Sequence, residues 1–340
     1  MAKREHFPYS VLDLPELDNG ECLLPFDHAH MLGLGLTSRC NFDCPMCYYH
    51  DSSGTSEGAD MPLELIRKIM KGCGDLRNVN VSLEGEPFLH PRVFDALDFI
   101  SGYAESISLS TNGALLNKDK INRLRQYRFS AFSMSIDADS GTFYKIFRGG
   151  GTLEIFERHA ALASECLEGT VSFNTVLFRE NINHVAGIPA LAKRCGVNRV
   201  SLMQLRPHAG ARARGITSTT EAELLTCLGT LAEEAEKWGV ELVFDPFFGN
   251  ARVMQWLQKN DSEAINVLPS PVGWSCVFPW HYASILSDGR LFPCCGDFGP
   301  ITLENYDFDG IYNHPVMQRL RQSLIRGMLP QACRACHFLT

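Results

Sequence analysis

The sequence predicts an α/β fold: a partial (β/α)6 barrel of the TIM type, followed by a small C-terminal α+β domain. Short apolar runs alternate with stretches of helical periodicity, which is typical of parallel βαβ architecture. Each helical stretch follows its apolar run closely enough for a right-handed crossover. Polar residues also gather at the ends of the apolar runs, where barrels of this kind carry their chemistry.

Six barrel strands are predicted, at 31–36, 78–83, 106–110, 131–136, 171–177 and 199–205. The helices expected between them cover about 62–72, 91–102, 118–126, 152–166 and 182–195. A helix at 219–238, a strand at 240–244 and an irregular stretch at 246–272 follow. We therefore divide the chain into an N-terminal extension (1–30), the barrel (31–215), a bridging helix and strand segment (216–270) and a C-terminal domain (271–340).

The composition excludes several classes of partner. The 340 residues are 45% hydrophobic, which is enough for a large buried core. The net charge is −8 with both signs interleaved, so nothing favours nucleic acid or an anionic membrane. No apolar stretch approaches the roughly 20 residues that span a bilayer, and the N-terminus lacks the apolar core of a signal peptide. We expect a cytoplasmic protein.

Thirteen cysteines without an export signal indicate thiolate chemistry rather than disulfides. Cys40, Cys44 and Cys47 follow the first predicted strand at x3 and x2 spacing. A closed [4Fe–4S] cluster takes four thiolates, so this triplet predicts a cluster with one open iron. A zinc site completed by His50 stays open as an alternative, although the x2 spacing is cramped for tetrahedral closure.

A second group of cysteines lies near the C-terminus. Between its first two members, the segment 287–294 reads as a tight hairpin with Asp288-Gly289 at its turn. Four thiolates suit either a closed iron–sulfur cluster or a structural zinc ion. The group consists of Cys276, Cys294, Cys333 and Cys336, whereas Cys73, Cys166, Cys195 and Cys227 fall in helical patterns and are interpreted as buried apolar residues.

Polar residues follow four of the predicted strands. Taken singly, each group is an ordinary turn or helix cap. Their recurrence at the same face of the barrel predicts a binding site there. The groups are Glu84–Pro87, Ser110–Gly113, Ser133–Asp137 and, within the fifth strand, Asn174.

The cysteine triplet after the first strand, together with Gly85-Glu86-Pro87, resembles the radical S-adenosylmethionine (SAM) superfamily. The resemblance implies that SAM binds the open iron and is cleaved to a 5′-deoxyadenosyl radical, which abstracts hydrogen from the substrate. The C-terminal cysteines resemble the twitch domain, a shortened relative of the SPASM domain. This second resemblance implies one auxiliary [4Fe–4S] cluster.

The superfamily resemblance also implies roles for individual residues. Gly85 and Glu86 match its motif, whereas Glu84 stands where a glycine is usual. Glu86 would receive the methionyl ammonium of SAM, and Arg148 would pair with its carboxylate. Further contacts to SAM are implied for Thr111, Asn112, Ser135, Asp137 and Leu205.

Three residues are candidates for contact with the substrate. Cys295 adjoins a predicted cluster ligand and is either a packed or alternative-ligand thiol, or a hydrogen-atom donor as in some radical epimerases. Arg206 and His208 follow the sixth strand, where a hydroxyl that loses its proton needs a base.

Only about 30 residues precede the first strand, whereas peptide-modifying relatives often carry an N-terminal recognition domain. This favours a small polar metabolite, such as a sugar, an aminocyclitol or a nucleoside-like compound. We expect a dehydrogenase with the auxiliary cluster as electron acceptor, or an epimerase, served by a flavodoxin- or ferredoxin-type electron donor. A peptide-modifying maturase stays an alternative, as does a non-catalytic iron–sulfur or zinc regulatory protein.

Overall fold

The structure, a computed structural model, describes residues 31–48, 58–205, 209–244, 265–267, 278–293 and 301–325. Its strands form one sheet with the order β10-β9-β1-β2-β3-β4-β5-β6-β7-β8. All neighbours from β9 through β1 to β8 pair in parallel, and only the β10–β9 pair is antiparallel. The predicted partial barrel is confirmed, and further strands extend it at both edges.

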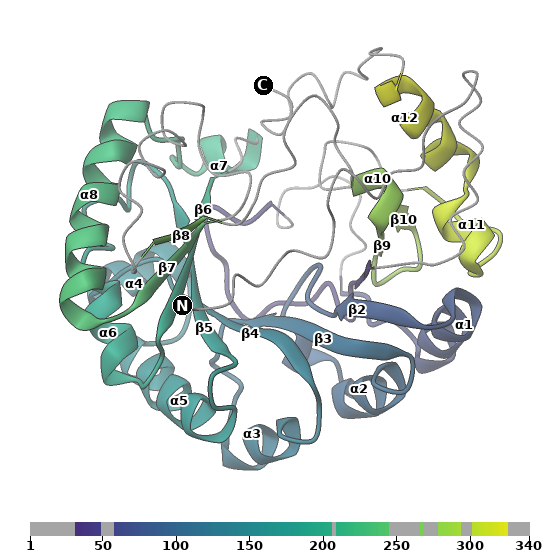
Figure 1. The fold of residues 1–340 in the computed structure, drawn as a ribbon, viewed down its shortest axis with the longest axis horizontal. Coiled ribbons are helices and arrows are strands. Elements are labelled where there is room, and N and C mark those ends of the chain that lie inside the picture. The colour runs from purple at the N-terminus through teal and green to yellow at the C-terminus, as the bar shows by residue number, and fades with distance from the viewer. Residues whose placement is uncertain are drawn as a thin grey trace.

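The six predicted barrel strands are all present, with ends that differ by a few residues. They are β1 (Met31–Leu34), β2 (Leu76–Asn80), β3 (Ala104–Thr111), β4 (Phe129–Ser135), β5 (Val171–Leu177) and β6 (Arg199–Gln204). The predicted helices between them are α1 (Leu63–Cys73), α2 (Val93–Ile100), α3 (Lys118–Leu124), α5 (Leu153–Cys166) and α6 (Ile188–Arg194). Figure 1 shows these helices in an arc around the outside of the sheet.

The strands alternate apolar and polar residues because the sheet has two different faces. In β3, Ile107 and Leu109 are buried in the same core as the helices. Ser106 and Ser108 point to the other, concave face, where both hydroxyls hydrogen-bond to the side chain of Asn78 at 3.1 and 2.9 Å. The concave face is thus polar along the strands that carry the site.

Several of the described elements were not predicted, including a helix between β4 and β5 and a strand after β7. Helix α4 (Gly141–Arg148) was not expected, and it ends at Gly149, which takes the left-handed conformation with φ 65°. Strand β8 (Ile265–Val267) lies inside the stretch expected to be irregular, where it pairs with β7 (Glu241–Phe244). The prediction was wrong at both places, because a short helix or strand leaves little periodicity to read.

Two helices follow β6 in the sequence. They are α7 (Ala209–Ala213) and α8 (Glu221–Trp238), which was predicted. A capping box starts α8: the Thr220 side chain accepts from the Glu223 amide, and the Glu223 carboxylate accepts from the Thr220 amide.

The C-terminal part is α+β, as predicted, but its hairpin joins the barrel sheet. Gly289 has φ 86° at the predicted turn, and β9 pairs in parallel with β1. The Tyr312 hydroxyl also donates to the carbonyl of Met31 at 2.5 Å. The elements are α10 (Phe278–His281), β9 (Tyr282–Ile285), β10 (Leu291–Phe292), α11 (Phe308–Tyr312) and α12 (Pro315–Ile325).

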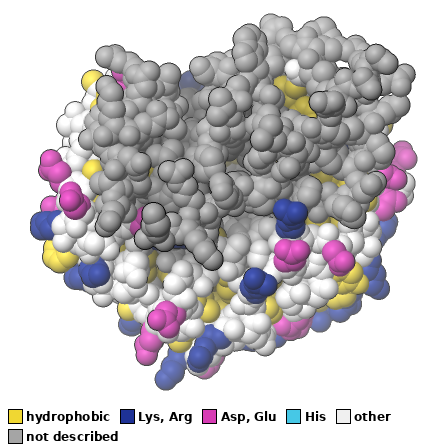
Figure 2. Space-filling model, in the orientation of Figure 1, with side chains coloured by type: hydrophobic (Ala, Val, Ile, Leu, Met, Phe, Trp, Pro, Cys, Tyr) yellow, Lys and Arg dark blue, Asp and Glu magenta, His cyan; other side chains and the backbone are white. Residues whose placement is uncertain are grey.

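Acidic and basic side chains are interspersed on the coloured part of the face that Figure 2 shows. Such a surface carries no large field of one sign. Among the helices that the structure describes, none is long and apolar enough to cross a bilayer.

Removal of the capping hydroxyl in Thr220→Ala should destabilise the fold by about 1 kcal/mol, because the Glu223 amide loses its acceptor. The check is the free energy of unfolding from urea titration of the reconstituted protein. Thr226→Ala is the control, since among the described residues that hydroxyl bonds the Ala222 carbonyl on the surface of the same helix. Equal losses in the two variants would contradict the capping assignment.

Candidate cluster and cofactor site

The cysteine triplet lies in a loop that begins directly after β1, and its first residues are held from two sides. Arg39 forms a bidentate ion pair with Asp60, at 3.1 Å to Oδ1 and 2.8 Å to Oδ2. The same guanidinium donates to the carbonyl of Leu89 at 2.6 Å. The carbonyl of Arg39 accepts from the Glu86 amide at 2.8 Å. The backbone before Cys40 is therefore fixed to the loop after β2.

The middle of the cysteine loop packs against the end of α4. A side chain at Gly149 would collide with the carbonyl oxygen of Asp43. Added Cβ atoms at Gly150 and Gly151 would each lie 2.6 Å from the ring of Phe42. At Gly149 only glycine allows this approach, because the backbone of one segment lies directly on the other, whereas at Gly150 and Gly151 a side chain would meet an aromatic ring. The run Gly149–Gly151 is the sequence signal for this contact, and we did not predict it.

The three thiols differ in exposure: Cys40 is exposed, Cys44 is buried and Cys47 is half-buried. Burial raises the pKa of Cys44 to about 11, although nearby Arg148 lowers it. The Cys44 thiol donates to the carbonyl of Arg148 at 3.1 Å. A cluster ligand must be a thiolate, so iron would have to displace this proton.

Glu86 is buried at the centre of a hydrogen-bond network. It caps the short helix η3 (Pro87–Leu89) by accepting from the Phe88 amide. Its carboxylate also accepts from the Thr111 hydroxyl at 2.7 Å and the Asn112 amide at 2.8 Å. Burial raises the pKa of Glu86, and these hydrogen bonds lower it. A carboxylate has about four acceptor positions, and the described residues occupy three of them, which leaves one for a ligand ammonium.

The network reaches the cysteine loop. The Asn112 side chain donates to Asn41 Oδ1 at 2.8 Å, and Asn41 follows Cys40 directly. The structure thus brings together Glu86, Thr111 and Asn112, three of the residues predicted to contact SAM. Asn41 itself was not predicted, since an asparagine in a loop carries no distinctive sequence signal.

Arg148 and Asp137, which were predicted separately, form a buried ion pair. Arg148 Nη1 donates to Asp137 Oδ2 at 2.7 Å, and Asp137 Oδ1 accepts from the Val176 amide at 2.8 Å. Burial acts to lower the pKa of Arg148, but Cys44 and Asp137 raise it above its usual value. The guanidinium therefore stays charged. Within the described residues its buried Nε has no partner.

The other predicted SAM contacts are placed at the same end of the barrel. Gly85 is left-handed with φ 64°, and a Cβ added there would collide with the carbonyl oxygen of Thr37 and lie 2.6 Å from that of Arg39. Ser135 ends β4 and is half-buried, while Leu205 follows β6 and is 6% exposed. Their contacts with SAM stay predictions.

Several predicted residues lie outside the residues that the structure describes. They include all four C-terminal cluster ligands and the three substrate candidates, so their predicted roles stay predictions. These residues are Cys276, Cys294, Cys333, Cys336, Cys295, Arg206 and His208. His50, the rival zinc ligand, is also outside.

Three of the four cysteines in helical patterns are buried, as predicted. Cys73, Cys195 and Cys227 are less than 9% exposed, and burial raises the pKa of each thiol. Such thiols are unreactive near neutral pH. Cys166 is only half-buried, and its thiol faces the Asn122 side chain at 3.9 Å.

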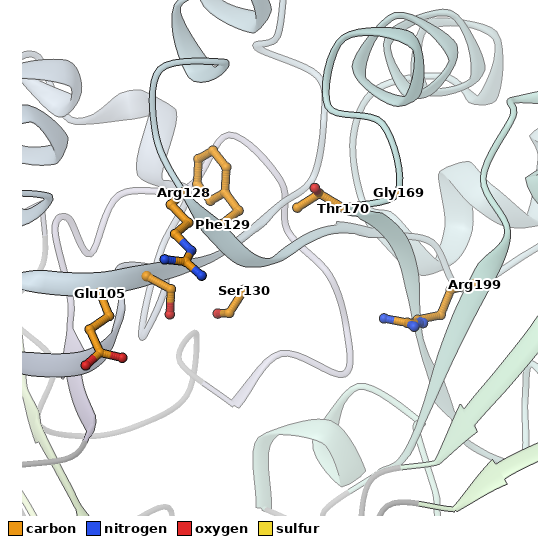
Figure 3. A pocket seen from close by; sticks show the side chains of 8 residues that line it. Glu105, Arg128, Phe129, Ser130, Gly169, Thr170 and Arg199 are labelled. Atoms are coloured by element: carbon orange, nitrogen blue, oxygen red, sulfur yellow. The ribbon is translucent and has the colours of Figure 1, made fainter. Parts of the chain in front are cut away.

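A pocket of about 380 Å³ lies at the opposite end of the strands, where β3, β4 and β6 begin. Figure 3 shows Arg128, directly before β4, and Arg199, the first residue of β6, reaching into it. Arg199 is already paired with Glu241 through Nε at 2.8 Å. The pocket shares no residue with the cysteine loop, so it is not the candidate active site.

The donor set fits an iron–sulfur cluster with SAM. Three thiols come from one short loop, and a buried carboxylate and a largely buried guanidinium flank that loop. Among the described residues, no three His, Cys, Asp or Glu side chains are placed to hold one metal ion. A cubane binds each thiolate to a different iron, so its ligands lie farther apart than those of a single ion. The arrangement is that of a barrel whose loop at the carboxyl ends of the strands carries residues suited to an iron–sulfur site.

Comparison with known families finds a match for two separate segments of the chain. The Radical SAM superfamily matches residues 34–191, and the SPASM iron–sulfur cluster-binding domain matches residues 276–337. The chain therefore contains a radical SAM domain and a SPASM-type iron–sulfur domain. The radical SAM domain implies a [4Fe–4S] cluster and SAM as cofactors, and the SPASM domain implies auxiliary iron–sulfur clusters. The prediction of a single auxiliary cluster stays a prediction.

Relatives resemble the chain over most of its length. Mycofactocin maturase MftC of Mycobacterium ulcerans is 23% identical over 88% of this chain and 78% of its own. An AdoMet-dependent heme synthase of Methanosarcina barkeri is 23% identical over 76% of this chain and 74% of its own. SuiB of Streptococcus suis, solved with its precursor peptide SuiA, has TM-score 0.66 and 15% identity over 86% of this chain and 67% of its own. The SuiB likeness confirms the fold.

We predict that Gly149→Ala separates the cysteine loop from α4, because the new methyl group collides with the Asp43 carbonyl. After anaerobic reconstitution, the variant should lose roughly four irons per chain, the content of one cluster. Gly239→Ala is the matched control: Gly239 has φ 63°, but nothing lies within 4 Å of its added Cβ. Full iron content in Gly149→Ala would show that this contact does not support the cluster.

Proposed function

We propose that this radical SAM enzyme is a maturase that modifies a peptide. The observation that carries the proposal is the similarity to MftC, which extends over both the barrel and the C-terminal domain and covers 88% of this chain. SuiB, which shares the fold, was solved with its precursor peptide SuiA. This substrate class was the alternative in our sequence analysis, where a small metabolite was favoured.

In the proposed mechanism, the chain binds SAM through two opposite charges. Cys40, Cys44 and Cys47 would hold the cluster, Glu86 would take the methionyl ammonium, and Arg148 would take the carboxylate. When bound, the cluster and SAM supply a 5′-deoxyadenosyl radical that removes a hydrogen atom from the substrate. Asp137 orients Arg148 by holding one terminal nitrogen, which leaves Nε for the ligand.

A small polar metabolite is the second candidate, as the substrate of a dehydrogenase or an epimerase. The match to the heme synthase of Methanosarcina barkeri supports it, as does the polar concave face around Asn78 and Ser108. In this version Arg206 or His208 serves as base, and Cys295 as hydrogen-atom donor. The auxiliary cluster would accept the substrate's electron, and a flavodoxin- or ferredoxin-type protein would reduce the first cluster.

The radical chemistry is tested by SAM cleavage. Anaerobically reconstituted protein, reduced with dithionite and given SAM, should release 5′-deoxyadenosine, measured by liquid chromatography. The triple variant of Cys40, Cys44 and Cys47 to Ala should lose all cleavage but keep about half its iron, because the two cluster sites are separate. Loss of all iron would contradict two separate sites, and no cleavage by fully loaded wild type would overturn the enzyme assignment.

The substrate class is tested by offering both kinds of candidate. Short peptides encoded beside the gene, and a panel of sugars, aminocyclitols and nucleosides, are incubated separately with enzyme and SAM in deuterated water. We expect a peptide to change mass in step with 5′-deoxyadenosine release. Conversion of a metabolite alone would favour the second candidate. A carbonyl product would then indicate dehydrogenation, and deuterium at carbon would indicate epimerisation.

A further inference from the structure

Glu84 is the one residue of the Gly85-Glu86 loop that departs from the superfamily motif, and the structure buries it. Its side chain is 2% exposed. One carboxylate oxygen accepts from the backbone amide of Ser287 at 2.6 Å. Ser287 begins the turn between β9 and β10, so this bond joins residues that are 203 positions apart in the chain.

The same carboxylate also lies over the end of β1. A Cβ atom added to Gly35 would be 2.7 Å from Glu84 Oε1 and 2.8 Å from its Cγ. The Gly35 amide in turn donates to the Ile285 carbonyl of β9 at 2.8 Å. Glu84 thus fills the space between β1 and the C-terminal hairpin.

A buried carboxylate is costly unless its contacts compensate for lost hydration. Burial raises the pKa of Glu84, and the hydrogen bonds from Ser287 lower it. The nearby Arg290 guanidinium is held by Asp288, with Nε at 2.6 Å from Oδ2. Within the described part of the chain, Glu84 Oε2 has no partner. The contact with the hairpin is therefore the main interaction of this carboxylate.

Backbone contacts hold the loop on the C-terminal side of Glu84. Gly85 is left-handed, and a side chain there would collide with the carbonyl of Thr37. The Glu86 amide is held by the carbonyl of Arg39 at 2.8 Å. A shift of Glu84 therefore has to move Glu86 or break these contacts.

We propose that Glu84 is a positioning residue that ties the Glu86 loop to the β9–β10 turn, so that docking of the C-terminal hairpin supports SAM binding. The inference rests on the proposed role of Glu86 toward SAM. It adds a link between the radical SAM barrel and the SPASM-type part of this chain, through a residue that stands where the motif has glycine.

The test measures the Kd for SAM and the iron content of the full-length, reconstituted protein. In Glu84→Ala the acceptor for Ser287 is lost, so Kd should rise about tenfold while iron content stays unchanged. Glu84→Gln keeps an acceptor oxygen and should bind SAM within about threefold of wild type. Glu105→Gln is the control, because Glu105 is exposed and lies at the start of β3, away from the Thr111 end that faces Glu86.

Gly35→Ala provides a second test that does not depend on the folding of Glu84→Ala alone. The new methyl group meets Glu84 first, so Gly35→Ala should weaken SAM binding by itself. In the Glu84→Ala background, Gly35→Ala should weaken SAM binding much less than it does in the wild-type background. A double-mutant cycle on the Kd for SAM measures this coupling.

Unchanged SAM affinity in Glu84→Ala, or additive effects of the two substitutions, would overturn the positioning role. Equal weakening by Glu84→Gln and Glu84→Ala would also overturn it, because charge rather than the hydrogen bond would then matter. Failure of wild type to bind SAM would instead reject the proposed function.

Discussion

The packing of the cysteine loop between two left-handed glycines is the constraint on which the site depends. Gly85 lies against the carbonyls of Thr37 and Arg39, and Gly149 lies against the carbonyl of Asp43. Each contact brings a charged neighbour to the loop, since Glu86 follows Gly85 and Arg148 precedes Gly149. The positions of the three thiols, the carboxylate and the guanidinium are therefore set by backbone contacts, before any ligand binds.

The electrostatics of the site follow from this packing. Glu86 is buried and Arg148 is largely so, and the described residues leave each of them with an open hydrogen-bonding position. A buried charge with an open hydrogen-bonding position is costly in isolation and favourable with a ligand of opposite charge. The amino and carboxylate groups of SAM supply one charge of each sign. Asp137 keeps Arg148 charged although burial opposes that charge.

The sequence was sufficient for the six barrel strands, the cysteine triplet and the grouping of Glu86, Thr111 and Asn112. Alternation and helical periodicity are local signals, and polar strand ends are easy to read in a parallel fold. The pairing of β9 with β1, the approach of Gly149 to Asp43 and the contact of Glu84 with Ser287 were missed. Each of these contacts joins segments that are distant in the sequence. A glycine or a backbone amide has no side chain from which the sequence could indicate its contact partner.

The central claim is that SAM binds the cluster held by the cysteine loop, with Glu86 and Arg148 on its methionyl group. Electron–nuclear double resonance on the reduced protein tests it, with SAM labelled by ¹⁵N at the amino group and ¹⁷O at the carboxylate. We predict hyperfine coupling of both labels to the reduced cluster. In Arg148→Met the coupling of the ¹⁷O carboxylate label should be lost, while the coupling of the ¹⁵N amino label remains. Absence of both couplings in wild-type protein with full iron content would contradict the account.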